Sequence, residues 1–148
     1  MKRRLPILFT ILMLTLASLA CQRLSQFQQA DATPTAASPV SNIFMANDSA
    51  GINKTNIFAP KDEIYIFFDA NQAEVGTYFE ARWYVLSLPE EVDPTVPFSI
   101  SSYTYEGGST VIQAFIQSSH EDGFTPSQCK VEVYMDGVKV AEQFFTIQ

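Results

Sequence analysis

The chain has 148 residues, of which 47% are hydrophobic, and it carries a net charge of −7. This length suits one domain with a tail, and the apolar content is sufficient for a core. The acidic balance argues against nucleic acid as a partner, because binding to phosphates requires a basic surface. No residue pattern predicts a cofactor, and none is expected.

The first twenty residues have the features of an export signal. Three positive charges within Met1–Arg4 precede a run, Leu5–Ala20, that contains no charged residue. This run has 16 residues, whereas a membrane-spanning helix needs about 20. A basic start followed by a short apolar segment is typical of a secretory signal peptide. Residues 1–20 are therefore expected to be removed and the rest of the chain exported.

The end of this segment, Ala17–Cys21 (Ala-Ser-Leu-Ala-Cys), resembles the lipobox of bacterial prolipoproteins. The resemblance implies that the Cys21 thiol receives a diacylglyceryl group, with palmitate among the expected acyl chains, and that cleavage occurs just before Cys21. Two or three acyl chains give stable membrane anchoring. Ser18 departs from the family, which usually has Leu at that position. The segment also fits the ordinary signal peptidase, so free secretion without lipid is the alternative.

Anchoring through Cys21 predicts an extracytoplasmic location on the cell membrane. In a bacterium with two membranes the outer one is expected, because Gln22 is not the Asp that usually signals retention in the inner membrane. Signal removal leaves a charge of −10, since three positive charges lie in residues 1–20. This charge argues against adhesion to anionic lipid, so the acyl chains are the expected membrane contact.

Lipidation of Cys21 leaves Cys129 without a disulfide partner in the chain. With one histidine beside it, Cys129 also cannot complete a zinc site of four ligands. We expect Cys129 to pack as a small apolar side chain.

The segment 21–41 is rich in Ala, Ser, Thr, Gln and Pro. Such a composition buries too little apolar surface to offset its ordering entropy, so a disordered tether is expected. A short helix over residues 22–30 is the alternative. A single domain is expected over residues 42–148.

From residue 42 onward, short runs of Val, Ile, Phe, Tyr and Thr alternate with turn residues, which predicts strands. No helical period occurs after residue 41. Two hairpins are expected: one across Glu106–Gly108, and one across Asp136-Gly137, where both residues must tolerate positive φ. The predicted strands are Asn42–Ala46, Glu63–Asp69, Tyr78–Leu86, Phe98–Tyr105, Ser109–Ser118, Gln128–Met135 and Val138–Ile147, with a short bridge at Ile57-Phe58.

Alternation within the strands predicts which side chains face the core. The strand Glu63–Asp69 is apolar on both faces, so it is expected in the centre of a sheet with partial cover outside. Two other strands have one apolar face each, made by Phe79, Ala81, Trp83 and Val85 in one strand and by Cys129, Val131, Val133 and Met135 in the other.

About seven strands in about 107 residues, with Trp83 in the third main strand and Cys129 in the sixth, resemble an immunoglobulin-like or fibronectin-type-III-like domain. The resemblance implies an all-β fold: a single antiparallel sandwich of about seven strands. Ile64 and Ile66 stand where immunoglobulins carry the first disulfide cysteine, so no such bridge is expected.

The candidate catalytic and metal-binding residues are few. His120 lies in a loop between Ser118 and Asp122, but no nucleophile turn or oxyanion motif accompanies it, so no enzyme is expected. Carboxylates gather at Glu90, Glu91, Asp93, Glu121 and Asp122. Their spacing fits no calcium loop, and no metal is expected.

The outward face of the sheet offers the candidate binding residues Arg82, Tyr84 and Tyr134. Arg82 and Glu132 should lie on adjacent strands. One interpretation is a cross-strand ion pair supported by the tyrosines. The other is a binding face for a protein or glycan, because Tyr and Arg are enriched at contact hot spots. Tyr103 and Tyr105 are further candidate platforms for sugar.

These features predict a membrane-anchored, non-catalytic recognition module that binds a protein or glycan. The alternatives are an accessory subunit of a cell-envelope complex, which would pair through its last strand or a sheet edge, and a freely secreted β-sandwich protein.

Overall fold

The computed structural model describes residues 38–87 and 92–148. The predicted signal peptide, Cys21 and most of the predicted tether lie outside the described residues. The compact unit comprises Ser38–Gln148. Packing begins at its start, because Val40 is buried in the core and the Ser38 hydroxyl donates to the carbonyl of Val140 at 3.1 Å. Among the described residues, no helix has the length and apolar character needed to cross a membrane.

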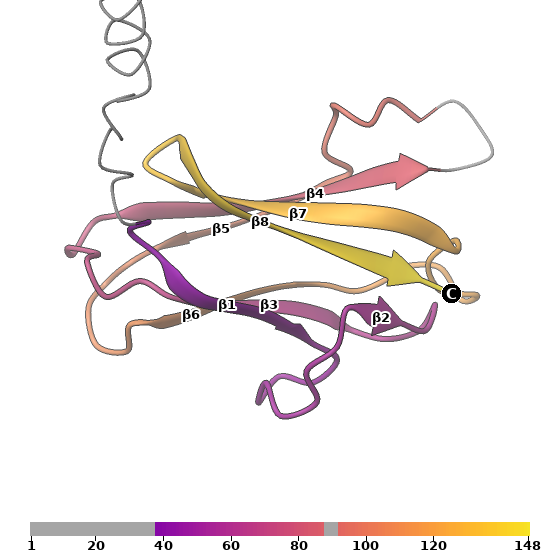
Figure 1. Ribbon diagram of the computed structural model, residues 1–148, viewed down its shortest axis with the longest axis horizontal. Coiled ribbons are helices and arrows are strands. Elements are labelled where there is room, and N and C mark those ends of the chain that lie inside the picture. Colours follow the sequence, from indigo (N-terminus) through magenta and orange to yellow (C-terminus); the bar gives the residue numbers. More distant parts are fainter. Residues whose placement is uncertain (1–37, 88–91) are drawn as a thin grey trace, which may run out of the picture. The chain divides into compact units, whose positions relative to one another are not determined.

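Two β-sheets pack face to face, which confirms the predicted all-β sandwich (Figure 1). The three-stranded sheet has the order β1-β3-β6, and the five-stranded sheet has the order β2-β8-β7-β4-β5. The strands of the described residues are β1 (Ser41–Ala46), β2 (Ile57–Phe58), β3 (Ile64–Asp69), β4 (Tyr78–Ser87), β5 (Ser99–Thr104), β6 (Val111–Ile116), β7 (Ser127–Met135) and β8 (Val138–Ile147).

The sandwich follows the immunoglobulin-like plan. β4, β7 and β8 are neighbours in one sheet and take the places of the C, F and G strands, while β1, β3 and β6 take those of A, B and E. One pairing departs from the expected purely antiparallel sheets, because β2 is parallel to β8, with Ile57 opposite Thr146 and Phe58 opposite Ile147. β2 follows the loop after β1, so the chain crosses from the three-stranded sheet to the five-stranded sheet between these two strands.

The predicted hairpin between β5 and β6 is wrong. β5 pairs with β4, whereas β6 pairs with β3 in the opposite sheet. The connecting segment is held at both ends by backbone hydrogen bonds to different sheets: Tyr105 N donates to Thr77 O at 2.9 Å, and Ala70 N donates to Thr110 O at 2.8 Å. The glycines of this segment therefore serve a crossover between layers and not a tight turn.

The hairpin of β7 and β8 is confirmed. Asp136 and Gly137 have φ values of 49° and 80°, as a two-residue turn of this kind requires. Asp136 also ties the turn to β4, because its backbone N–H donates to the carbonyl of Tyr78 at 2.8 Å.

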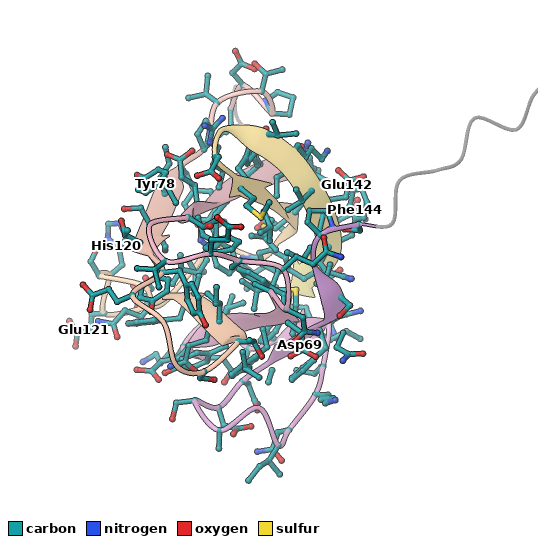
Figure 2. The ribbon with its side chains drawn as sticks, turned by 90° about the vertical axis from the view of Figure 1, so that its left-hand side faces the viewer. Asp69, Tyr78, His120, Glu121, Glu142 and Phe144 are labelled. Carbon is teal, nitrogen blue, oxygen red and sulfur yellow. The ribbon has the colours of Figure 1, made fainter. Side chains whose placement is uncertain are left out.

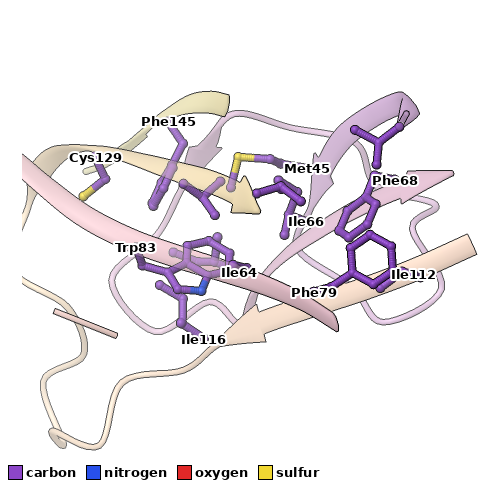
Figure 3. Close-up of a cluster of buried hydrophobic side chains, with 14 of the residues drawn as sticks. Met45, Ile64, Ile66, Phe68, Phe79, Trp83, Ile112, Ile116, Cys129 and Phe145 are labelled. Carbon is purple, nitrogen blue, oxygen red and sulfur yellow. The ribbon is translucent and has the colours of Figure 1, made fainter. Parts of the chain in front are cut away.

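The predicted core faces are confirmed. Phe79, Ala81 and Trp83 of β4 are buried, as are Cys129 and Val131 of β7. The rings of Trp83 and Phe145 make an edge-to-face contact with centroids 6.0 Å apart. Figure 3 shows Trp83 beside Ile64 and Ile116, with Phe68 facing Phe79 across the sheets.

β3 lies between β1 and β6, which confirms its predicted central place. Its outward side chains Tyr65 and Phe67 are buried, because the loop after β1 folds over them. Phe44 stacks on Phe67 with ring centroids 5.0 Å apart. Gly51 of the covering loop lies so close that an added Cβ would be 3.1 Å from the Phe44 ring.

Candidate functional site

The outward face of the five-stranded sheet brings Arg82 and Glu132 together, as expected, because the register of β4 and β7 places them directly opposite. The two side chains nevertheless do not form an ion pair with each other, and each contacts other residues. Arg82 Nη2 lies 2.6 Å from Glu80 Oε2 on its own strand. Its guanidinium carbon lies 3.9 Å from the centroid of the Tyr134 ring. The expected Arg82–Glu132 ion pair is therefore replaced by an Arg82–Glu80 pair and a stack on Tyr134.

Glu132 is the one buried charged residue of the described chain. Its carboxylate accepts hydrogen bonds from Lys130 Nζ at 2.6 Å, Lys139 Nζ at 2.9 Å and the Tyr134 hydroxyl at 2.8 Å. Burial acts to raise the pKa of Glu132, but these three donors outweigh it and lower the pKa to about 2. The carboxylate is thus a fixed anion at the centre of the face.

The tyrosines of this face are engaged in the same network. Tyr84 is buried, and Lys130 Nζ lies 4.8 Å from the centroid of its ring. The hydroxyl of Tyr134 is bonded to Glu132. These contacts correspond to the interpretation in which the tyrosines support a charged network. A binding role for Arg82, Tyr84 and Tyr134 stays a prediction. Tyr103 and Tyr105 cannot both offer an aromatic surface to a sugar, because Tyr105 is buried and only Tyr103 of these two is exposed.

His120 lies in the loop between β6 and β7 and is exposed. Figure 2 shows His120 and Glu121 at the margin of the domain, away from Glu142 and Phe144. The hydroxyl of Ser118 accepts a hydrogen bond from the backbone N–H of His120 at 3.1 Å. Among the described residues, which do not include Glu90 and Glu91, no group of three His, Cys, Asp or Glu side chains could hold a metal.

A cavity of about 560 Å³ opens at the end of the sandwich that carries the C terminus. This volume lies within the range of about 300–1,000 Å³ that is usual for small-molecule sites. The apolar lining comes from both sheets and from two loops, and its residues are Val85, Val92, Phe98, Phe115, Ile116, Phe124, Cys129 and Ile147. The lining also includes hydroxyl, amide and imidazole side chains, from Ser99, Gln117, Ser118, Ser119, His120, Thr125 and Ser127. We call this cavity the end pocket.

The wall of the end pocket formed by Gly123 and Phe124 is fixed by close backbone contacts. The N–H of Phe124 donates to the carbonyl of Pro60 at 2.8 Å. Gly123 has a φ of +88°, and a Cβ at this position would lie 2.3 Å from the same Pro60 oxygen. Only glycine permits this approach, so the loop is held against the segment after β2.

Phe98 and Cys129 fix two further parts of the lining. Phe98 is anchored to β4 through its N–H, which donates to the carbonyl of Trp83 at 2.8 Å. Its ring meets that of Phe124 edge to face at 6.5 Å. The Sγ of Cys129 lies 3.3 Å from the hydroxyl of Ser127. Burial raises the pKa of the Cys129 thiol, so the sulfur contributes to the pocket as an apolar group.

The end pocket lies opposite to the point where the described chain begins. Ser38 is bonded to Val140, near the start of β8, whereas Ile147 at the end of β8 lines the pocket. The ten residues of β8 therefore span the distance between the two ends.

Sequence reasoning missed the end pocket. Its lining comes from β4, β6, β7, β8 and the loops before β5 and β7, and each of these segments contributes only a few residues. The sequence predicts an apolar environment for Cys129 and a loop at His120. Nothing local to either residue shows that they share a cavity.

No known family model matches this chain. No curated protein matches it significantly either. Among solved structures, the alkylpurine DNA glycosylase AlkC of Pseudomonas fluorescens, bound to DNA containing an abasic site analog, is similar with a TM-score of 0.45 and 13% identity. The match covers 74% of this chain and 30% of the glycosylase chain. A similarity this low carries no functional inference.

Proposed function

We propose that this chain is a lipid-anchored extracytoplasmic binding protein whose sandwich domain takes an apolar ligand into the end pocket without catalysing a reaction. The observation that carries the proposal is the cavity of about 560 Å³ between the ends of the two sheets. A concave, mostly apolar cavity with a few polar groups is the usual form of a small-molecule site. The walls are built on strands and on a loop fixed by Gly123, which favours a preformed site.

The anchoring part of the proposal rests on the sequence of Ala17–Cys21 and on the tether that follows it. Two or three acyl chains on Cys21 would hold the protein at a membrane surface. The domain itself begins at Ser38, so the segment 22–37 is available as a spacer.

Ligand binding can be tested with a neutral apolar dye, N-phenylnaphthylamine, titrated into the mature chain with Cys21→Ser. We expect saturable fluorescence enhancement. Thr125 is exposed and lines the pocket, so Thr125→Phe should obstruct it and weaken dye binding about tenfold, which corresponds to about 1.4 kcal/mol. Thr104→Phe is the matched control, because Thr104 is exposed at the far end of β5. Equal binding by both variants would place the dye elsewhere, and absence of binding would refute the proposed pocket.

Anchoring is tested separately by intact-mass analysis of the membrane fraction. The mature protein should carry the mass of a diacylglyceryl group, and Cys21→Ser should abolish both the added mass and the membrane association. An unmodified mature protein in the medium would instead support free secretion.

A further inference from the structure

Three exposed carboxylates adjoin lining residues of the end pocket in the sequence. Glu121 and Asp122 lie between His120 and Gly123, which both line the pocket. Asp93 adjoins the lining residue Val92 on the other side. None of the lining residues is a lysine or an arginine. The apolar cavity is thus combined with a negative rim.

The cationic side chains of the described residues are mostly engaged elsewhere. Lys130, Lys139 and Arg82 form ion pairs on the outward face of the five-stranded sheet. Lys54 Nζ lies 3.8 Å from the centroid of the Phe44 ring on the other sheet. The remaining described cation, Lys61, follows Pro60 in the segment that contacts the pocket loop. One lysine cannot neutralise three carboxylates, so a negative potential persists at the mouth.

We propose that the ligand of the end pocket is a small amphiphilic cation, with its apolar part in the cavity and its positive group at Glu121 and Asp122. This inference rests on the proposed function. The apolar lining accounts for affinity through burial of the ligand's hydrocarbon. The rim accounts for discrimination, because a positive group is attracted there and an anionic group of the same size is repelled. The small volume of the cavity favours a small molecule over a folded partner.

The test compares two ligands that share a hydrocarbon chain and differ in the sign of the head group. Decyltrimethylammonium and decyl sulfate, each below its micelle concentration, compete with N-phenylnaphthylamine for the mature Cys21→Ser chain at low ionic strength. We expect the cation to displace the dye at a concentration about tenfold lower than the sulfate does. Added salt should reduce the preference, because exposed charges are screened.

Two double variants separate the local rim from the overall charge. Glu121→Gln with Asp122→Asn should abolish the preference for the cation. Glu74→Gln with Glu106→Gln removes the same two charges from exposed loops that do not line the pocket, and it should leave the preference intact. Both double variants retain the pocket lining, so dye binding itself should stay unchanged.

The outcomes distinguish this inference from the function on which it rests. If the dye binds and both decyl compounds displace it equally, or if the rim variant keeps the preference, the cationic ligand is refuted while the pocket stands. If neither the dye nor either decyl compound binds, the proposed function itself fails.

Discussion

The guanidinium of Arg82 stacks on the ring of Tyr134, 3.9 Å from its centroid, although its register partner on β7 is the carboxylate of Glu132. Tyr134 in turn donates its hydroxyl to Glu132. Tyr134 therefore contacts both Arg82 and Glu132, the two opposite charges that the strand register places side by side. These contacts predict how charge substitutions on the outward face change the unfolding free energy.

An exchange of the two register partners should not restore stability. In Arg82→Glu with Glu132→Arg, the new arginine would face Lys130 and Lys139, and the new glutamate would lie beside Glu80. The double variant should lose at least as much unfolding free energy as the sum of the single variants, measured by urea denaturation. The exchange of Glu80 with Arg82 is the control, because it preserves an ion pair and should recover about 0.5 kcal/mol. Recovery of wild-type stability by the first exchange would show that Arg82 and Glu132 do form the pair.

Glu132 should make the stability of the domain depend on pH. Its pKa is lowered from 4.5 to about 2 in the folded chain. A carboxylate with a depressed folded pKa contributes stability above its unfolded pKa, and this contribution is lost as the pH falls from about 4.5 through about 2. Glu132→Gln should cost about 2 kcal/mol at neutral pH, because the two lysines and Tyr134 lose a charged acceptor.

Urea denaturation over pH 2 to 7 measures this effect, and the difference between wild type and Glu132→Gln should narrow on acidification. Glu142→Gln is the matched control: Glu142 is exposed, and its carboxylate pairs with Lys139 alone among the described residues, so its loss should cost less than about 0.5 kcal/mol. A constant difference across the pH range would contradict the assigned role of Glu132.

Gly123→Ala should destabilise the domain by about 2 kcal/mol or more. Its new Cβ would meet the carbonyl oxygen of Pro60 at 2.3 Å, and the φ of +88° is itself unfavourable for alanine. Gly76→Ala isolates the backbone contribution, because Gly76 has a φ of +97° with nothing within 4 Å. It should cost only about 1 kcal/mol. Thermal unfolding compares the two, and equal losses would mean that the contact with Pro60 does not hold the loop.

Cys129 should be inert toward alkylation in the folded protein. Its side chain is buried, and burial raises the pKa of the thiol, which removes the reactive thiolate. In the Cys21→Ser chain, iodoacetamide should modify Cys129 much more slowly under native conditions than in urea, as followed by mass spectrometry. Full modification in urea is the control. Rapid reaction under native conditions would show that Cys129 carries a reactive thiolate despite its burial.

The sequence alone determined the all-β character, the inward faces of β4 and β7, the central place of β3 and the turn at Asp136-Gly137. These features depend on the alternation of side chains along one strand, or on the φ values that two adjacent residues must adopt. Both are properties of a short stretch of chain. The acidic charge is likewise readable without a fold, whereas the export signal over residues 1–20 and the lipidation of Cys21 stay predictions.

Only the tertiary structure decided which sheet each strand joins. The glycines after β5 predicted a hairpin, but the chain crosses between the sheets there: the Tyr105 N–H donates to Thr77, and the Thr110 carbonyl accepts from Ala70. The end pocket was equally hidden, because its walls come from segments as distant in sequence as Val85 and Ile147. The partners of Glu132 also needed the fold, since Lys130 and Tyr134 of its own strand and Lys139 of β8 bind its carboxylate in place of Arg82. Such choices depend on packing between distant segments, which no local pattern of residues encodes.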